Sequence, residues 1–524
     1  MILIRNLRLG PEEPLDTLPL RAAKKLRIAP ERIGEWRLVK KSLDARRKDD
    51  IHYVCAIACE VEGKLRIRDK DVSDYTPPVY EIPQIEAASR PVVAGFGPAG
   101  MFAALVLAKA GARPIVLERG QDAQTRLAAV ELFRAGGALD PENNVQFGEG
   151  GAGTFSDGKL NTGTHDSRLH WVLEQFAAHG APESVRWDAK PHIGTDILVE
   201  VVQAFRREIV SLGGEVRFGA KLTGLRIEDG MLLGVEVNHT ETLPCCALIL
   251  AIGHSARDTF EMLLEAGIPM EPKPFSMGVR IEHRQEAVDL AQYGCARGEL
   301  PAADYSLNVS LADGTSAYTF CMCPGGQVFA AASEEGGVVT NGMSYSRRDG
   351  ENANAALLVT LHPEDFPGEG VLAGMYWQRE IERRAFRLGG GNYRAPAQRA
   401  GDFLAHVPST GPGAVQPSYR PGVRWCELHE LLPARITGVL EQAIPALGRK
   451  LRGFDDPDAV LTAPETRSSS PVRILRGADL SAVVAGLYPC GEGAGYAGGI
   501  SSAAVDGMRC AEAALRLIDA DRRL

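Results

Sequence analysis

The chain has 524 residues, which is too long for one hydrophobic core and predicts roughly three domains at ~100–200 residues each. Hydrophobic residues make up 45% of it and charged residues 24%, a balance typical of a globular protein rather than a disordered one. No run approaches the ~18 apolar residues of a membrane span, and Met1–Arg5 is too short for the apolar part of a signal peptide. We therefore expect a cytoplasmic protein without a membrane partner.

Residues 1–85 are predicted to form a small ferredoxin-like α+β domain with little room for a second helix. The expected elements are the strand Ile2–Leu9, the helix Leu15–Ile28 and the strands Trp36–Leu43 and Tyr53–Val61. Residues 1–70 carry 17 Lys and Arg against 11 Asp and Glu, so this part is basic although the whole chain has a net charge of −9. A solvated face docked on the acidic remainder is the favoured interpretation. Tyr53 alone would be available for base stacking, so nucleic acid is not the expected partner.

The stretch Pro91–Gly100 is typical of a short buried strand that turns through glycines into an apolar helix. Gly95 permits the tight turn, Gly97 lets the backbone approach a diphosphate, and Gly100 lets the helix pack closely on the strands. The helix N-terminus then offers N–H groups to the diphosphate. Glu118 ends the next strand at the ~20-residue spacing where a carboxylate meets a ribose hydroxyl. These features predict a dinucleotide-binding unit.

The rest of the chain indicates two further domains. The expected elements are a helix at Asp196–Leu212, a β-meander through Glu215–Asn238, an apolar strand at Ala247–Gly253, a strand at Val483–Gly491 and a helix at Ser501–Ala520. We predict that residues 86–268 and 467–524 form one discontinuous Rossmann-like α/β domain. Residues 269–466 lack a second glycine fingerprint and are predicted to be an inserted α+β substrate domain.

The ten cysteines show no paired CxxC spacing, so neither a zinc site nor a disulfide framework is expected. Most are interpreted as small buried apolar residues. Cys321 and Cys323 would share one face of a strand, and a redox dithiol there is the less favoured alternative.

The sequence resembles the largely uncharacterised FAD-dependent dehydrogenases, also called NAD(FAD)-utilising dehydrogenases, of the glutathione-reductase-like flavoprotein superfamily. The resemblance covers nearly the whole chain and rests on the glycine turn described above and on the stretches Phe147–Leu160, Met322–Gly326, Asn341–Ser344, Asn352–Asn354, Glu465–Arg473 and Gly491–Ile500. It implies non-covalently bound FAD, with Gly95, Gly97 and Gly100 at the diphosphate and Glu118 at the adenosine ribose. It also implies main-chain contacts from Leu222 to adenine, and Gly491 and Glu492 near the ribityl-diphosphate.

The residues predicted to complete the cofactor site come from the same motifs. They are Pro98, Ala99, Arg119, Gly151, Gly153, Thr154, Ser156, Lys159, Gly253, Gly498, Gly499 and Ile500. The glycine turn at Gly95–Gly100 and the glycine loop at Gly491–Ile500 lie far apart in the sequence, yet both suit one long ligand. This arrangement favours FAD over NAD.

Four side chains are candidates for chemistry. Lys159 would stabilise an anionic reduced flavin, with a surface pair to Asp157 as the alternative. His254 could donate a proton, although a structural histidine is the favoured interpretation. Arg467 and Arg473 flank a Ser-Ser-Ser-Pro turn and could clamp an anionic substrate, or could tie the inserted domain to acidic neighbours.

We therefore expect an FAD-dependent oxidoreductase that transfers hydride between flavin N5 and an unidentified small molecule. A nicotinamide donor, NAD(P)H, would have to dock transiently, because no second nucleotide-binding domain is indicated. Two alternatives stay open, a flavin-dependent RNA-modifying enzyme and a non-catalytic flavoprotein that acts as a redox sensor or scaffold. The oligomeric state cannot be read from the sequence.

Overall fold

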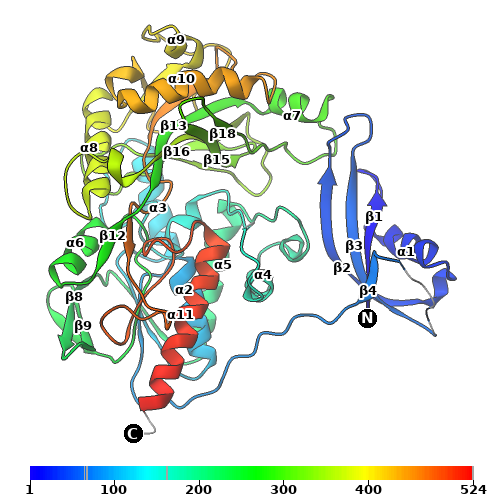
Figure 1. Ribbon diagram of the computed structural model, residues 1–524, viewed down its shortest axis with the longest axis horizontal. Coiled ribbons are helices and arrows are strands. Elements are labelled where there is room, and N and C mark those ends of the chain that lie inside the picture. Colours follow the sequence, from blue (N-terminus) through cyan, green and yellow to red (C-terminus); the bar gives the residue numbers. More distant parts are fainter. Residues whose placement is uncertain (64, 66–68, 161–162, 522–524) are drawn as a thin grey trace.

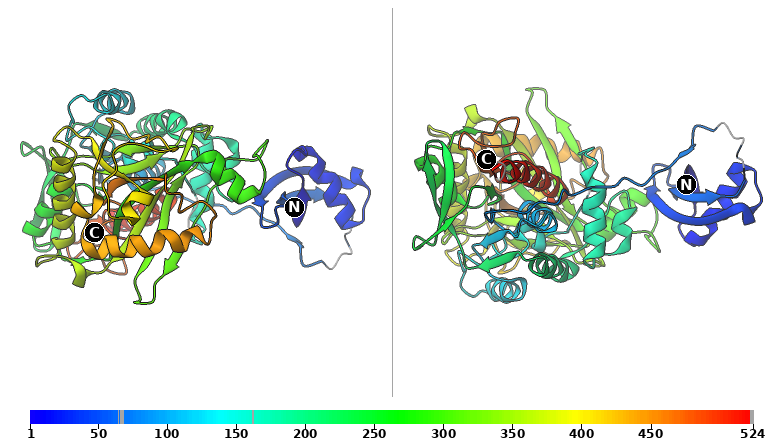
Figure 2. Two further views of the ribbon diagram at one scale, coloured as in Figure 1. Left: turned by 90° about the horizontal axis from the view of Figure 1, so that it is seen from above. Right: turned by 90° about the horizontal axis from the view of Figure 1, so that it is seen from below.

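The computed structural model describes residues 1–63, 65, 69–160 and 163–521 (Figure 1). It contains a small N-terminal sheet, a domain built on a five-stranded parallel sheet and a domain built on a seven-stranded sheet. Figure 2 shows the N-terminal sheet at one end of the molecule, beside the other two parts, to which an extended segment also joins it. Among the described residues, none of the helices combines the length and the apolar character that a bilayer crossing needs.

The N-terminal domain is an antiparallel sheet with the strand order β2-β3-β1-β4. Its elements are β1 (Ile2–Leu9), α1 (Leu18–Leu26), β2 (Ile33–Asp44), β3 (His52–Val61) and β4 (Val72–Asp74). Leu18, Ala22 and Leu26 lie on one face of α1 and pack against the buried side chains of β1 and β3. Strand β3 lies between β1 and β2, as in a split βαβ unit. Within the described residues, α1 is the domain's single α-helix, so the second helix of a ferredoxin-like fold is missing.

The segment that follows the N-terminal domain is packed on the parallel-sheet domain rather than free. The Tyr80 hydroxyl donates to Glu512 at 2.7 Å, and its ring lies 5.1 Å from that of Trp171. The Ile85 N–H donates to the carbonyl of Ala110 at 2.9 Å. The packing unit of the second domain therefore begins before residue 86.

The parallel sheet has the order β23-β11-β5-β6-β7. Its strands are β5 (Val92–Ala94), β6 (Ile115–Glu118), β7 (Glu215–Phe218), β11 (Leu248–Leu250) and β23 (Leu487–Pro489). Val93 faces the helices α2 (Pro98–Lys109), α5 (Thr195–Ser211) and α11 (Ile500–Asp521). Val92 faces the opposite layer, because successive strand side chains point to opposite faces. The sheet thus joins both ends of the domain, with β23 and α11 supplied by the last residues of the chain.

The predicted β-meander is wrong at its first strand. Strand β7 pairs in parallel with β6 at the edge of the main sheet. The antiparallel layer consists instead of β8 (Leu222–Glu228), β9 (Met231–Val237) and β10 (Glu241–Pro244). Alternating side chains look the same in both settings, so the sequence pattern could not separate them.

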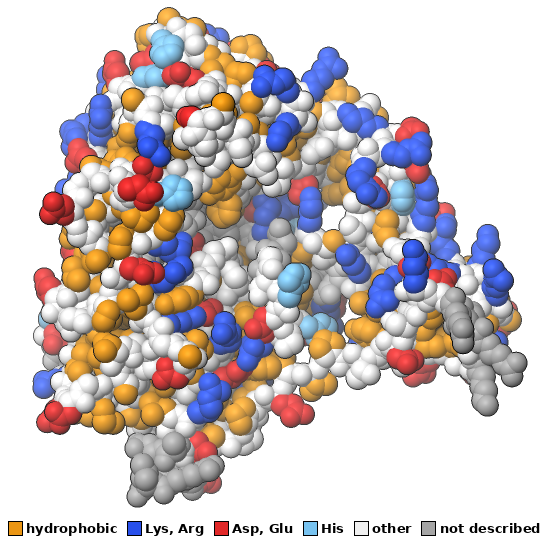
Figure 3. Space-filling view, in the orientation of Figure 1, with side chains coloured by type: hydrophobic (Ala, Val, Ile, Leu, Met, Phe, Trp, Pro, Cys, Tyr) orange, Lys and Arg blue, Asp and Glu red, His pale blue; other side chains and the backbone are white. Residues whose placement is uncertain are grey.

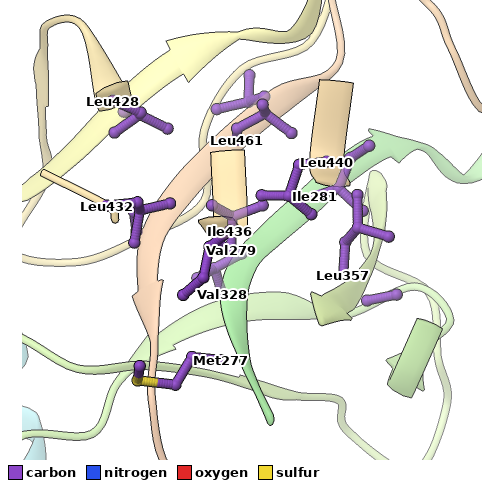
Figure 4. Close-up of a cluster of buried hydrophobic side chains, with 14 of the residues drawn as sticks. Met277, Val279, Ile281, Val328, Leu357, Leu428, Leu432, Ile436, Leu440 and Leu461 are labelled. Carbon is purple, nitrogen blue, oxygen red and sulfur yellow. The ribbon is translucent and has the colours of Figure 1, made fainter. Parts of the chain in front are cut away.

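The inserted domain is a seven-stranded mixed sheet with the order β14-β15-β18-β13-β21-β19-β20. Its strands are β13 (Phe275–Arg284), β14 (Asn308–Ser310), β15 (Ser316–Cys323), β18 (Asn352–Leu361), β19 (Ala395–Arg399), β20 (Val423–Trp425) and β21 (Val460–Glu465). The helix α10 (Ala434–Gly448) covers this sheet, and Figure 4 shows Ile436 and Leu440 packed beside Val279 and Ile281 of β13.

Smaller elements connect these layers. They are α3 (Ala123–Arg134), α4 (Arg168–Ala178), α6 (Arg257–Glu265), α7 (Gln285–Tyr293), α8 (Ala373–Leu388), α9 (Ala400–Leu404), β12 (Met270–Pro272), β16 (Gln327–Ala330), β17 (Thr340–Met343) and β22 (Val472–Ile474). The chain enters the inserted domain through β12 and leaves it through β22, and these strands pair antiparallel. Both crossings therefore lie side by side.

Candidate functional site

A cavity of about 460 Å³ lies between the parallel-sheet domain and the inserted domain. It starts at the carboxyl ends of β5, β6 and β11 and extends to the end of β15. Strand β5 has β6 on one side and β11 on the other, so this edge is the switch point where open α/β sheets bind ligands. Figure 3 shows this face of the molecule hollowed near its centre, with many Lys and Arg side chains toward the N-terminal domain.

The first glycine turn joins β5 to α2 at the wall of the cavity. Gly95 has a φ of 98°, and a Cβ there would lie 2.3 Å from the carbonyl oxygen of Ala251. A Cβ on Gly100 would lie 1.9 Å from the carbonyl oxygen of Gly95. Gly97 has a different role, because the nearest atom to its Cβ would be 3.6 Å away, at the Cα of Gly151. Gly95 and Gly100 thus serve the fold, whereas Gly97 leaves space over the N-terminus of α2.

The second glycine loop, which includes a 3-10 turn at Gly151–Phe155, lies directly against the first. The Gly150 N–H donates to the carbonyl of Phe96 at 2.9 Å. A Cβ on Gly153 would lie 3.3 Å from the side chain of Ile500, the first residue of α11. The loop is therefore held between the starts of α2 and α11.

The third glycine segment closes the same wall from the end of the chain. Gly491 follows β23, and a Cβ on it would lie 2.8 Å from the Cβ of Ala99 in α2. Its N–H donates to Asp506 of α11 at 2.8 Å. Two helix N-termini, those of α2 and α11, consequently meet at one cavity wall, which favours an anionic ligand there.

Glu118 lies at the end of β6 and is 4% exposed. Its Oε1 accepts hydrogen bonds from the N–H groups of Gly120 at 2.9 Å and Gly148 at 2.8 Å. Its Oε2 accepts one from Phe96 at 2.8 Å. A carboxylate oxygen has two acceptor positions, so Oε2 retains one for a ligand hydroxyl. The neighbouring Arg119 is bound to acidic side chains instead.

The Arg119 guanidinium donates to Glu142 at 2.7 Å and to both oxygens of Asp258 at 2.8 and 3.0 Å. It also lies 4.0 Å above the centre of the Phe147 ring. These contacts hold Phe147 at the cavity wall, which Arg119 also lines.

The predicted cofactor-binding residues converge on this cavity. Every one of them lines it except Gly100 and Thr154, which are absent from the described lining. Thr154 is buried, and its hydroxyl donates to the carbonyl of Glu149 at 3.1 Å. Gly100 and Thr154 therefore support the site from behind.

Lys159 places a buried ammonium group in the cavity wall. Its Nζ lies 3.5 Å from Asp157, and the described residues give it no hydrogen-bond partner. Asp157 is itself occupied by Ser344 at 2.6 Å and by Arg348. Burial lowers the pKa of Lys159, but Asp157 and two nearby thiols outweigh it, so the pKa is raised. The Lys159 ammonium is therefore a charged donor in the cavity wall, and its neighbour Asp157 is buried rather than on the surface.

His254 lines the cavity at the end of β11, and its Nδ1 lies 3.0 Å from the Ser255 hydroxyl. Burial and the guanidiniums of Arg467 and Arg257 lower its pKa to about 4. The imidazole is therefore neutral near pH 7, where one ring nitrogen donates a hydrogen bond and the other accepts one, and its low pKa makes it a weak base.

Arg467 and Arg473 do not act on one cavity group in this structure. Arg467 makes two bonds to Glu382, at 3.0 and 2.7 Å, and one to Ser333 at 2.5 Å. Arg473 pairs with Glu271 at 3.2 Å across the β12–β22 ribbon, outside the described cavity lining. The structure thus separates the two arginines, with Arg467 in the cavity lining and Arg473 outside it, and their clamp on an anionic substrate stays a prediction. The alternative, in which the arginines hold the inserted domain in place, describes these contacts.

A buried polar network at the far end of the cavity was not identified from the sequence. Arg280 of β13 donates to Glu465 at 2.9 Å, to Asn354 at 2.9 Å and to Asn341 at 3.1 Å. Its Nη1 also donates to the carbonyl of Cys321 at 2.9 Å. Asn341, Asn354 and Glu465 lie in motifs that carried the family resemblance, which was the available signal.

Glu492 also faces this end of the cavity, beside Cys321. Burial, reinforced by the Cys321 thiol, raises the pKa of Glu492 to about 7, against the opposing charge of Lys273. It therefore exchanges a proton near neutral pH, unlike an ordinary surface carboxylate.

Residues able to hold a metal ion lie elsewhere, on the inserted domain. Ligand atoms of His406, His429 and Glu441 all lie within 4.8 Å of one another. His429 donates or accepts at both ring nitrogens, with Glu427 on Nδ1 and Glu441 on Nε2 at 2.6 Å. The sequence had predicted no metal site.

Two parts of the chain match known family models. Residues 274–468 match the family described as "FAD-dependent protein, C-terminal domain-like". Residues 1–60 match a domain of unknown function. A protein of Clostridium beijerinckii, described as "Uncharacterized protein", is 48% identical over 533 residues, and the match covers 99% of each chain.

Solved structures show only distant likeness. The flavin-dependent brominase Bmp2 is 12% identical, with a TM-score of 0.37 and coverage of 82% of this chain and 79% of that one. The L-proline dehydrogenase from P. horikoshii is 14% identical, with a TM-score of 0.32 and coverage of 84% and 94%. The glycerol-3-phosphate dehydrogenase from Bacillus halodurans, complexed with FAD, is 10% identical, with a TM-score of 0.36 and coverage of 84% and 66%.

Proposed function

We propose that this protein, which belongs to the same family as the Clostridium beijerinckii relative, binds FAD non-covalently and is an oxidoreductase acting on a small molecule. The observation that carries the proposal is the convergence of three glycine segments and two helix N-termini on one cavity wall. The first of these segments begins near residue 95 and the last near residue 491. A site for a short ligand would not need segments from both parts of the chain.

The glycine segments of the cavity wall would hold the cofactor. The N-termini of α2 and α11 would take the diphosphate, with Gly97 and Gly151 leaving room for it. The free acceptor position of Glu118 would take a ribose hydroxyl, and Leu222 would face the adenine. Bound FAD would supply two-electron redox chemistry at its N5 atom.

The far end of the cavity would hold the substrate and manage protons. Lys159 would offset negative charge that develops on reduction, because its ammonium is buried and lacks a competing hydrogen bond among the described residues. His254 would hydrogen-bond the substrate as a neutral imidazole, because its pKa is about 4. Glu492 would exchange a proton with the ligand, since its pKa is about 7. NAD(P)H is proposed as a transient hydride donor.

Gly97→Asp tests the cofactor assignment. It introduces a side chain and a negative charge over the N-terminus of α2, so we expect loss of bound flavin with little change in folding. Purified wild-type protein should release intact FAD into the supernatant on acid precipitation, and the variant should release almost none.

Gly411→Asp is the matched control. Its Cβ would meet nothing within 4 Å and it lies outside the described cavity lining, so it should keep its FAD. Release of FMN, or of no flavin from the wild type, would refute the proposal. Yellow colour left in the pellet would refute non-covalent binding.

A further inference from the structure

Two thiols lie together at the wall of the proposed substrate end. Cys321 lines the cavity, whereas Cys323, two residues later in β15, is fully buried behind it. The pairing of β15 with β18 shifts between Phe320 and Cys323, and Cys321 has a φ of 43°. Such a backbone is costly for a residue with a side chain and recurs at functional sites.

The irregular strand turns the Cys323 side chain back toward Cys321. The Cys323 thiol donates to the carbonyl of Cys321 at 3.3 Å, and each thiol shifts the pKa of the other. Arg280 donates to the same carbonyl, which holds the irregular segment in place. The pair therefore combines neighbouring thiols with access from the cavity through Cys321 alone.

The surrounding charges favour one thiolate in this pair. Lys159 and Arg280 face Cys321 from two other segments, and Asp157, Glu465 and Glu492 face it with the opposite sign. Asp157 and Glu465 are each bound to an arginine, which leaves the Lys159 ammonium as the uncommitted charge among the described residues. The neighbouring Cys323 thiol, together with Lys159 and Arg280, lowers the pKa of Cys321, whereas the pKa of Cys323 is raised, so the proton stays on Cys323.

We propose that Cys321 and Cys323 form a dithiol–disulfide couple that exchanges one electron pair with the flavin. The couple rests on the proposed function, because FAD is the oxidant. The Cys321 thiolate and the Cys323 thiol form a sulfur–sulfur bond, and the electron pair and the Cys323 proton pass to the oxidised flavin. The products are a disulfide and the singly protonated anionic reduced flavin, so atoms and charge balance, and the flavin anion replaces the thiolate beside Lys159.

With this couple the holoprotein can accept two electron pairs, one on the flavin and one on the disulfide. Holoprotein oxidised with diamide, and then freed of it, is titrated with dithionite without oxygen while the flavin absorbance is followed. We expect the wild type to take up two electron pairs per FAD, and Cys321→Ser and Cys323→Ser to take up one. Flavin content and melting temperature establish that each variant is folded.

Peptide masses provide a second measurement that needs no variant. Trypsin releases residues 298–347 as one peptide, whose only cysteines are Cys321 and Cys323. After diamide treatment this peptide should have lost two hydrogen atoms relative to its reduced form. A peptide that keeps both thiols would overturn the couple.

A second close thiol pair, Cys490 and Cys510, provides the control. Cys510→Ser should still take up two electron pairs. If Cys510→Ser took up only one electron pair, or if Cys321→Ser still took up two, the second electron pair would not belong to Cys321 and Cys323. Protein without FAD would overturn the proposed function and the couple together, whereas a flavoprotein that takes up one pair would overturn the couple alone.

Discussion

At the scale of single residues, the cavity contains ionisable side chains, among them Lys159 and Glu492, whose surroundings in the described structure shift their pKa values. The ammonium of Lys159 is buried beside a carboxylate that other donors already occupy. Glu492 is half-buried and forms no ion pair with an arginine among the described residues, so desolvation raises its pKa toward neutrality. Perturbed groups that meet in one cavity are the expected signature of a reactive site.

Glu492 makes stability depend on pH in a direction that can be measured. Its pKa is about 7 in the folded protein, against an ordinary value of 4.5, so folding is favoured at low pH and this contribution is lost as pH rises through 7. We expect the wild type to lose roughly 1–3 kcal/mol of unfolding free energy between pH 5 and pH 8 relative to Glu492→Gln. Urea unfolding of both FAD-free proteins at these two pH values measures the difference. An equal change in unfolding free energy between pH 5 and pH 8 in the two proteins would show that the pKa of Glu492 is not raised.

At the scale of elements, short glycine segments and strand ends position the site, and ion pairs join the two large domains. Glu382 of α8 receives Arg257 from α6 and Arg467 from the segment after β21. This triad is buried and links the helices of the parallel-sheet domain to the inserted domain. The β12–β22 ribbon carries the exposed pair of Arg473 and Glu271 at the same junction.

Arg467→Ala and Arg473→Ala should therefore differ in their effects on stability. Loss of Arg467 leaves Glu382 buried with one cation instead of two, so we expect a loss of about 2–4 kcal/mol. Loss of exposed Arg473 should change the unfolding free energy by less than about 1 kcal/mol. Chemical denaturation of the two variants beside the wild type measures both values. A tenfold weaker response of the flavin spectrum to anions in Arg473→Ala alone would instead restore the predicted substrate clamp.

At the scale of the whole molecule, the described part of the N-terminal domain contacts the body through the end of β2 and the residues that follow it, where Leu43, Ala45 and Ile51 pack on the core of the inserted domain. The backbone of Lys41 in β2 pairs with Trp187 and Ala189 at 2.8 and 2.9 Å. Lys48 reaches the carbonyl of Ala291 at 2.8 Å. The segment after this domain is bound more firmly, through Tyr80 and Ile85.

Two deletions separate the domain from its connecting segment. Removal of residues 1–75 should leave a folded, FAD-binding protein, because the cavity lining contains none of these residues in the described structure. Removal of residues 1–85 should lower the melting temperature further, because it also takes away Tyr80 and Ile82, which pack against the hydrophobic core around α2, α5 and α11. Flavin content and thermal unfolding of both truncated proteins measure the effect. An insoluble product from the shorter deletion would mean that the N-terminal sheet completes the core.

The sequence by itself determined the parts of this protein that depend on local rules. Gly95, Gly97 and Gly100 predicted the turn from β5 to α2, since their spacing is set by backbone sterics within a few residues. The bounds of α5 and α11 follow from apolar periodicity and agree with the predicted helices to within one residue at each end. The glycine loops at 147–160 and 491–500 likewise supply part of the cavity wall.

Only the tertiary structure decided which distant residues meet. The sheet partner of β7 depends on neighbours more than 90 residues away, so its alternating pattern suggested a meander instead. Arg467 faces Glu382 and Arg473 faces Glu271, and no spacing rule encodes either pairing. The charge of Lys159 acts on the Cys321 thiol across two domains, because long-range packing brings the end of β15 and the second glycine loop to the same cavity. Local geometry thus fixes the cofactor-facing wall, and packing between domains fixes the chemistry opposite it.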